Sequence, residues 1–538
     1  MAVKGNPWAV LIALCLGFFM TLLDTTVIGV AIPDILGQLH ITYNEVLWVS
    51  NTYVLVLAVL LIVGGRMGDL FGKRRMYLVG VAVFTVASLM CALAQDAAQL
   101  IAARSVQGLG AALLIPQTMS IIVSVFPAER RGSALGVWGA VAGVATITGP
   151  PLGGFLISTF DWRWIFTINV PIGLIVLVAA PLIIPAGGRT PRSGRFDLRG
   201  TALLVAGLSC LTYGLQEGQR LDWNLTVEVL LVAGVVLLTA FVLSERRPGT
   251  RQPLVPLTLF ANRNFSLMNA AAVTLSVGIM SLAIGFQLYA QSVLGMSALE
   301  AGMVNAPLSL MTVLIGPYAG RLADSYGGKF IVVGGLSLFT VGIVAFGFTA
   351  GVDSSAWSLL PSLLVMGVGL GLTFAPLSAI AMHDVQPTMA GAASGMINAT
   401  RQFGSVIGTA GFGVLLQNQL VGALSSHARS AAGELPAQAR EGFVAGVEQA
   451  AGRGIEFDQL RDGTAVAAPD GASGETVRMV GDAARRVFSG GFVDAFHVSL
   501  AYPVVALVIG VGCCLLVKVA PVQNDVQRGK SLRGGRIR

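Results

Sequence analysis

Long runs of apolar residues alternate with short polar segments along most of the 538-residue chain. A bilayer core about 30 Å thick requires a helix of roughly 20 apolar residues, and the runs reach that length without strand-like alternation. In lipid the backbone has to satisfy its own hydrogen bonds, as continuous helices do. The pattern therefore predicts an all-α integral membrane protein with fourteen spans. Their expected ranges are 8–32, 46–64, 76–94, 98–124, 133–157, 164–184, 199–216, 226–243, 266–292, 301–319, 330–350, 357–382, 391–416 and 497–518.

Two polar segments interrupt this series. Residues 185–198 are rich in Gly, Pro and Arg and form an expected inner linker, whereas residues 418–496 are rich in Ala, Gly and Glu. We expect 418–496 to be a solvated cap or flexible outer loop, with amphipathic helices at 434–450 and 475–488 as the alternative. The expected domains are a six-helix half (1–184), a linker with two extra spans (185–265), a second six-helix half that includes the outer loop (266–520), and a basic tail (521–538).

Composition supports a membrane protein and argues against a soluble enzyme. Hydrophobic residues make up 54% of the chain and charged residues 11%, whereas soluble domains carry about 25% charged residues. The net charge of +7 raises the question of nucleic-acid binding. However, most of the 34 Lys and Arg residues flank alternate span ends, so the charge predicts orientation instead. Both termini are expected in the cytoplasm, with the protein in the inner (cytoplasmic) membrane of the cell and no nucleic-acid partner.

An internal repeat divides the chain into two halves. The second span of each expected half is followed by a Gly-rich loop segment that contains an aspartate, and the fifth span of each half opens with a Gly-x-x-x-Gly pair. Duplicated halves with a site between them are common in secondary transporters. The repeated features are Gly65–Lys73 with Gly320–Lys329, and Gly132/Gly136 with Gly391/Gly395.

Five motifs give the chain a family resemblance. They are Leu23–Pro33, Gly65–Arg75, Leu100–Gly110, Gly149–Gly154 and Trp162–Gly173. Together they resemble the major facilitator superfamily and its 14-spanner drug:proton antiporter branch. The resemblance implies two six-helix halves with two inserted helices, export of small amphipathic or lipophilic compounds in exchange for protons, and no cofactor other than the proton gradient. We expect a monomer.

Asp24 and Arg104 are the candidates for proton coupling. Asp24 lies well inside the first span, where a charge costs several kcal/mol and so requires a role or a partner. Arg104 lies in the fourth span and keeps its charge, so it has to pair or face water. The resemblance implies that the two act together in coupling, with Gln107 one turn further along the same face. The alternatives are a structural hydrogen bond of Asp24 to Thr25 or Thr26, and a fixed ion pair for Arg104.

Further candidates fall into three groups. The repeated loops predict a cytoplasmic gate in which Asp and Arg side chains pair with a helix end or with a charge across the halves; topology determination alone is the alternative. A Gly-Pro cluster in the fifth span predicts close packing or a hinge, and polar or aromatic span residues are cavity candidates, although Arg401 is equally able to snorkel. The gate candidates are Gly65, Asp69, Gly72, Arg74 and Asp324; the hinge candidates are Gly149, Pro150, Gly153 and Gly154; the cavity candidates are Tyr53, Gln107, Trp138, Phe286, Gln287, Tyr289, Asn398 and Arg401.

Other functions have less support in the sequence. Phosphate-binding loops, metal-ligand clusters and catalytic constellations are missing from its motifs, which argues against ATP-driven transport, metal binding and enzymatic activity. The expected partners are a small-molecule substrate, protons and the lipid bilayer. A transporter of an endogenous metabolite or lipid remains the alternative, because the same motifs serve it equally well.

Overall fold

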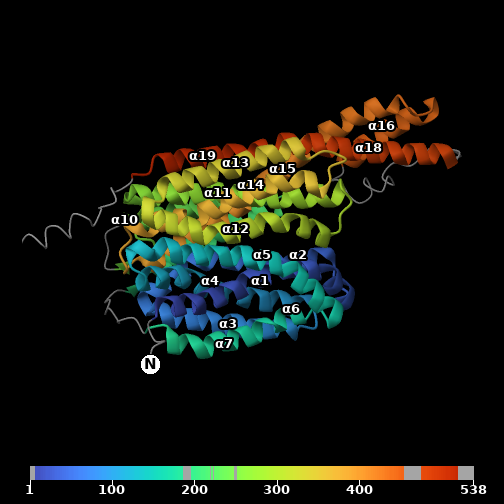
Figure 1. The fold of residues 1–538 in the computed structure, drawn as a ribbon. Coiled ribbons are helices and arrows are strands. Elements are labelled where there is room, and N and C mark those ends of the chain that lie inside the picture. Colours follow the sequence, from blue (N-terminus) through green and yellow to red (C-terminus); the bar gives the residue numbers. More distant parts are fainter. Residues whose placement is uncertain are drawn as a thin grey trace, which may run out of the picture.

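The computed structural model describes residues 6–185, 195–246 apart from Gln219 and Asp222, 251–452 and 474–518. Within these ranges the chain is almost entirely helical, and fourteen helical segments are long and apolar enough to cross a membrane (Figure 1). Each corresponds to one predicted span, which confirms the predicted fold class. The first part of the predicted linker and the basic tail lie outside the described residues.

The N-terminal half is a bundle of long helices joined by short turns (Figure 1). Polar side chains start several of them: Asn6 caps the first helix and Asp96 caps the fourth by accepting backbone N–H bonds. Its elements are α1 (Pro7–Leu39), α2 (Tyr43–Phe71), α3 (Lys73–Ala92), α4 (Ala97–Val125), the 3-10 turn η1 (Ala128–Arg130), α5 (Arg131–Thr159), α6 (Trp164–Thr167) and α7 (Asn169–Ile183).

The two inserted helices form a hairpin beside this half. Tyr213 of α8 stacks on Trp48 of α2 with ring centroids 5.5 Å apart, whereas α9 packs mainly against α8. The segments that lead into and out of the hairpin pair as two short parallel strands. The elements are β1 (Arg195–Phe196), α8 (Leu198–Glu217), α9 (Leu225–Glu245), β2 (Arg251–Gln252) and α10 (Thr258–Ala261).

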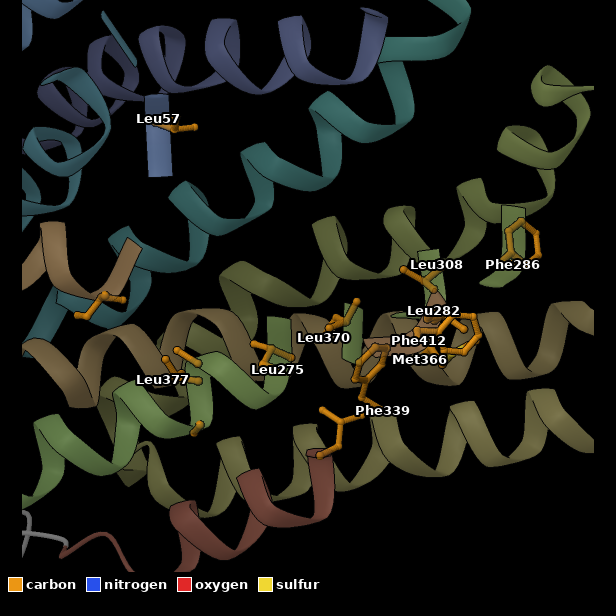
Figure 2. Close-up of a cluster of buried hydrophobic side chains, with 14 of the residues drawn as sticks. Leu57, Leu275, Leu282, Phe286, Leu308, Phe339, Met366, Leu370, Leu377 and Phe412 are labelled. Atoms are coloured by element: carbon orange, nitrogen blue, oxygen red, sulfur yellow. The ribbon is translucent and has the colours of Figure 1, made fainter. Parts of the chain in front are cut away.

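The C-terminal half repeats the bundle and packs beside the first (Figure 1). A layer of Leu, Met and Phe side chains fills its interior, as Figure 2 shows around Phe339, Met366 and Phe412. Its helices are α11 (Arg263–Ser292), α12 (Ala298–Tyr326), α13 (Lys329–Thr349), α14 (Ala356–His383), α15 (Ala390–Ala432), α16 (Ala437–Gly452), α18 (Gly474–Ser499) and α19 (Ala501–Leu515).

The expectation of a solvated outer loop at 418–496 is wrong for the residues that the structure describes, whereas the alternative of amphipathic helices at 434–450 and 475–488 is confirmed by α16 and α18. The helix α15 continues to Ala432, and α16 and α18 pack against its far end, so these three helices project beyond the bundle (Figure 1). The physical reason is a stripe of apolar side chains at every fourth position, which α15 buries against the returning helix. The stripe consists of Phe412, Leu416, Leu420, Leu424, Ala428 and Ala432.

The repeat is visible in the way equivalent helices begin. Thr42 and Glu45 form a capping box at the start of α2, and Ser297 and Glu300 form one at the start of α12. Both helices end near an aspartate of the repeated loops. We call the end of the bundle where α2 and α12 end, and α5 and α15 begin, the inner end; the charge distribution assigns it to the cytoplasm.

Candidate transport site

A buried ion pair lies in the N-terminal half. Arg104 Nη1 of α4 donates to Asp24 Oδ2 of α1 at 2.5 Å, and both side chains are 1% exposed. A buried pair of this kind is costly to break, because removing either partner leaves an uncompensated charge. The pairing of the two predicted coupling residues is therefore a strong constraint on how α1 packs against α4.

Amide groups complete the shell around the aspartate. Gln107 Nε2 donates to Asp24 Oδ1 at 2.9 Å, and Asn169 Nδ2 of α7 donates to the same oxygen at 3.0 Å. Gln107 Oε1 in turn accepts from Arg104 at 2.7 Å, and both amides reach the hydroxyl of Ser88 on α3. The carboxylate thus accepts three hydrogen bonds from two further helices, α4 and α7, so both of its oxygens have partners in this conformation.

The guanidinium of Arg104 also connects the ion pair to α2. Its Nε donates to the Val49 carbonyl at 3.1 Å, and its Cζ lies 4.4 Å from the Tyr53 ring centroid. Tyr53, a predicted cavity residue, is therefore buried against the ion pair. Because Asp69 lies sixteen residues further along α2, one helix about 24 Å long links the ion pair to the predicted gate.

One face of α1 next to Asp24 is open. Thr25 and Gly29 are exposed although they lie in the middle of a spanning helix. A Cβ atom added at Gly29 would meet no atom within 4 Å. This face lies between the contacts of Thr21 with Tyr53 of α2 and of Thr26 with Ala145 of α5. The exposed residues of this face are small and uncharged.

The two predicted gate aspartates each cap a helix of the opposite half. Asp69 of α2 accepts from the backbone N–H groups of Gly391 and Ala392, the first turn of α15, at 2.9 and 2.8 Å. Asp324 of α12 accepts from Gly132 and Ser133, the first turn of α5, at 2.7 and 2.8 Å. A carboxylate at a helix N-terminus interacts favourably with the helix dipole. The four hydrogen bonds, two from each aspartate, hold the halves together at the inner end.

Glycines let the backbones meet at these contacts. A Cβ at Gly65 would collide with the Gly391 carbonyl, so α2 and α15 approach closely. Gly72 joins α2 to α3 with φ +99°, a conformation that favours glycine. The gate candidate Arg74 contacts a helix end within its own half, because its Nη2 donates to the Pro181 carbonyl in the last turn of α7 at 2.6 Å. Lys73 crosses instead, donating to the Pro387 carbonyl at 2.8 Å.

The Gly-Pro cluster of α5 lies against α1 beside the ion pair. Gly149 faces Thr26, and a Cβ at Gly153 would lie 2.9 Å from Val27 Cγ1. Pro150 lies within a helix that runs unbroken from Arg131 to Thr159, whereas Gly154 faces open space. These glycines therefore let α5 approach α1 two and three residues after Asp24; their role as a hinge stays a prediction.

Three predicted cavity aromatics lie in the interiors of the halves. Trp138 stacks on Phe18 at 4.4 Å and donates its indole N–H to Thr118 at 3.1 Å. Tyr289 stacks on Phe496 at 5.5 Å and donates to the Gly351 carbonyl at 2.7 Å. Phe286, labelled in Figure 2, packs near Phe346 with ring centroids 5.9 Å apart. Their contacts are within one half, so the structure does not place them on a surface between the halves.

The remaining cavity candidates are polar. Asn398 donates to the Ser394 carbonyl of its own helix, and Gln287 is half-buried on α11. Arg401 Nη2 donates to Ser378 of α14 at 2.8 Å, and its Cζ lies 5.4 Å from the Phe374 ring centroid. Arg401 therefore points into the protein toward α14 and does not snorkel.

Sequence reasoning missed Asn169 and Ser88. Both are small polar residues in apolar spans, where a hydroxyl or amide more often bonds to its own helix. The sequence does contain one signal for Asn169: it lies within the Trp162–Gly173 motif, which carries part of the family resemblance. The motif by itself does not show which residue Asn169 contacts.

Together, two repeated bundles, buried charges at membrane depth and contacts that close one end define the class as polytopic membrane transport proteins. The family model of the Major Facilitator Superfamily matches residues 14–409. The chain therefore belongs to the major facilitator superfamily, as the motifs predicted, and it is a transporter and not an enzyme.

Several named transporters are similar to this chain over most of their own length. The chain is 38% identical to the uncharacterized MFS-type transporter Rv1250 of Mycobacterium tuberculosis, covering 82% of this chain and 78% of that one. It is 34% identical to the probable actinorhodin transporter of Streptomyces coelicolor (82% and 77%) and 33% identical to multidrug resistance protein Stp of Mycobacterium tuberculosis (78% and 77%). The crystal structure of the human organic anion transporter MFSD10 shares the fold, with a TM-score of 0.57 at 14% identity over 76% of this chain and 93% of that one.

Proposed function

We propose that this protein is a proton-coupled antiporter of the cytoplasmic membrane that exports small amphipathic or lipophilic compounds by alternating access. Relatives named for multidrug resistance and for an antibiotic support the substrate class. The observation that carries the coupling is the ion pair of Asp24 with Arg104, which is buried within the spans and held by residues of the three helices α1, α4 and α7. We further propose that the transporter is a monomer.

Protonation of Asp24 would reorganise this pair. A protonated carboxyl loses its charge and most of its attraction for the guanidinium, so Arg104 would be left as an uncompensated buried cation. Arg104 also binds the Val49 carbonyl of α2, the helix that carries Asp69. Proton binding would thereby change the forces on α2 and bias the equilibrium between inner-closed and inner-open states. One elementary charge crossing the membrane contributes about 2.3 kcal/mol per 100 mV.

The experiment is dye uptake into everted membrane vesicles. The probe is tetramethylrhodamine methyl ester, a lipophilic cation, and the variant is Asp24→Asn at matched expression. Asp34→Asn is the control, because Asp34 lies on the same helix ten residues nearer its outer end and is not part of the ion-pair network. We expect uptake by the wild type and Asp34→Asn that stops when the proton gradient is collapsed, and none by Asp24→Asn.

Two results would overturn the proposal. Uptake by the wild type that persists after collapse of the gradient would reject proton coupling. Normal gradient-dependent uptake by Asp24→Asn would show that the coupling residue lies elsewhere.

A further inference from the structure

Arg401 is a cation inside the bundle for which the structure provides no counter-charge. Among the residues that the structure describes, no carboxylate forms an ion pair with it. Its Nη2 reaches only the Ser378 hydroxyl, and its Nε is buried without a hydrogen-bond partner. A guanidinium has five N–H donors and keeps its charge in proteins, so most of its bonding capacity is unused.

The position of Arg401 makes this costly. It lies eleven residues from the start of α15, which places it about 16 Å from the inner end, near the middle of a 30 Å hydrocarbon core. Charged side chains at that depth pair with one another, face water or mark a substrate pathway. Asp24 is not available to Arg401 in this state, because Arg104 and two amides already occupy its oxygens.

The surroundings of Arg401 lie at the contact between the halves. The Phe374 ring beside the guanidinium belongs to α14, and a Cβ at Gly139 of α5 would lie 3.5 Å from Phe374 Cβ. Arg401 itself is half-buried, and a planar guanidinium that makes a single hydrogen bond beside an aromatic ring matches an anionic group on an apolar body. Carboxylates, sulfonates and phosphates accept two parallel N–H bonds from a guanidinium.

We propose that Arg401 binds the acidic group of the exported compound, so that the preferred substrates are amphipathic organic anions. This inference rests on the proposed export function and deepens it by naming the substrate class. The bound anion would supply the charge that Arg401 lacks, while the Phe374 ring would contact the apolar body. The same chemistry also fits the phosphate of an anionic lipid, and the test below distinguishes a lipid phosphate from the acidic group of an exported compound.

The test compares two dyes that differ in one group. Tetramethylrhodamine carries a free carboxylate, whereas its methyl ester has the same rings without it. Binding of each to the purified full-length protein in phosphatidylcholine nanodiscs is followed by fluorescence anisotropy, which needs no proton gradient. We expect the wild type to bind the acid about tenfold more tightly than the ester, as one charge-assisted hydrogen-bonded pair allows.

Variants assign this preference to the guanidinium. Arg401→Gln should bind both dyes alike, with ester affinity unchanged, and Arg401→Lys should recover part of the preference. Arg429→Gln is the matched control, because it removes the same charge from an exposed site on the same helix. Thermal unfolding of each variant checks that it is folded. A preference for the acid that survives Arg401→Gln, or its absence from the folded wild type, would overturn the inference.

Nanodiscs that contain phosphatidylglycerol distinguish the two sources of the anion. Weaker acid binding there in the wild type, but not in Arg401→Gln, would show that a lipid phosphate competes for Arg401 and so supports the anion site. The outcomes are also separable from those of the proposed function. An Arg401-dependent preference together with dye uptake that ignores the proton gradient would leave the anion site intact and reject the coupling.

Discussion

Replacing Asp69 by Asn should release the inner end of the bundle. In the structure the Asp69 carboxylate accepts two backbone N–H bonds from the first turn of α15, at 2.9 and 2.8 Å. Hydrogen bonds to a charged group contribute about 1.5–3 kcal/mol each, and an amide oxygen retains one of them in neutral form. The net loss is therefore about 2 kcal/mol, which shifts the closed-to-open ratio roughly 30-fold.

Distances between spin labels measure this shift. Labels at Phe71 and Tyr326 lie on exposed ends of α2 and α12, in different halves, and report their separation at the inner end. We expect Asp69→Asn to move the distribution from a short to a longer distance, and Asp324→Asn to do the same. Both substitutions should also change the balance between substrate binding and release, because alternating access requires a closed inner state.

The matched control is Glu300→Gln. Glu300 accepts the Ser297 N–H at 2.8 Å in the capping box of α12, so this substitution weakens a helix cap without touching the contact between the halves. Its label distances should equal those of the wild type. Unchanged distances in both Asp69→Asn and Asp324→Asn would refute the reasoning that these carboxylates hold the inner end closed.

Three further substitutions test other parts of the structure. Gly29→Trp should abolish dye uptake with little change in the melting temperature, since the ring would occupy open space; normal uptake would exclude this face of α1 from the pathway. Trp138→Phe should lower stability by about 1 kcal/mol through the lost hydrogen bond while uptake continues, and a change in dye preference would contradict its placement in the core. Phe496→Ala should cost about 3–5 kcal/mol in unfolding assays, because it contacts Tyr289, Phe412 and Phe492 in the C-terminal half; a loss under 1 kcal/mol would contradict that packing.

The sequence alone predicted the membrane spans and the pairing of the two charged residues, Asp24 and Arg104, within them. Continuous runs of twenty apolar residues without strand-like alternation form helices in lipid, and a carboxylate such as Asp24 inside a span needs a partner, here the cation Arg104. The repeat also predicted that Asp69 and Asp324 play equivalent parts, and the structure gives each a helix N-terminus of the opposite half.

The sequence did not predict which aromatic side chains point into the core of the bundle and which into a cavity or the lipid. A membrane helix is apolar on all sides, so periodicity does not tell a side that faces lipid from one that faces the core or a cavity. Trp138 and Tyr289 were therefore assigned to a cavity, although both are buried in a core. For the projecting helices the sequence left two interpretations open, a loop or amphipathic helices. Small polar residues in the outer part of α15 and charged residues in α18 dilute the apolar stripes until the segment resembles a loop by composition.

The length of α15 has a mechanical consequence. Its 43 residues form one helix of about 64 Å, twice the thickness of the hydrocarbon core. One end receives the Asp69 carboxylate, and the other carries α16 and α18 (Figure 1). A stiff rod of that length amplifies rotation: a tilt of about 5° about the inner end displaces the far end by about 6 Å. If α15 tilts as one body when the Asp69 contact at the inner end opens, α16 and α18 move with it at the outer surface.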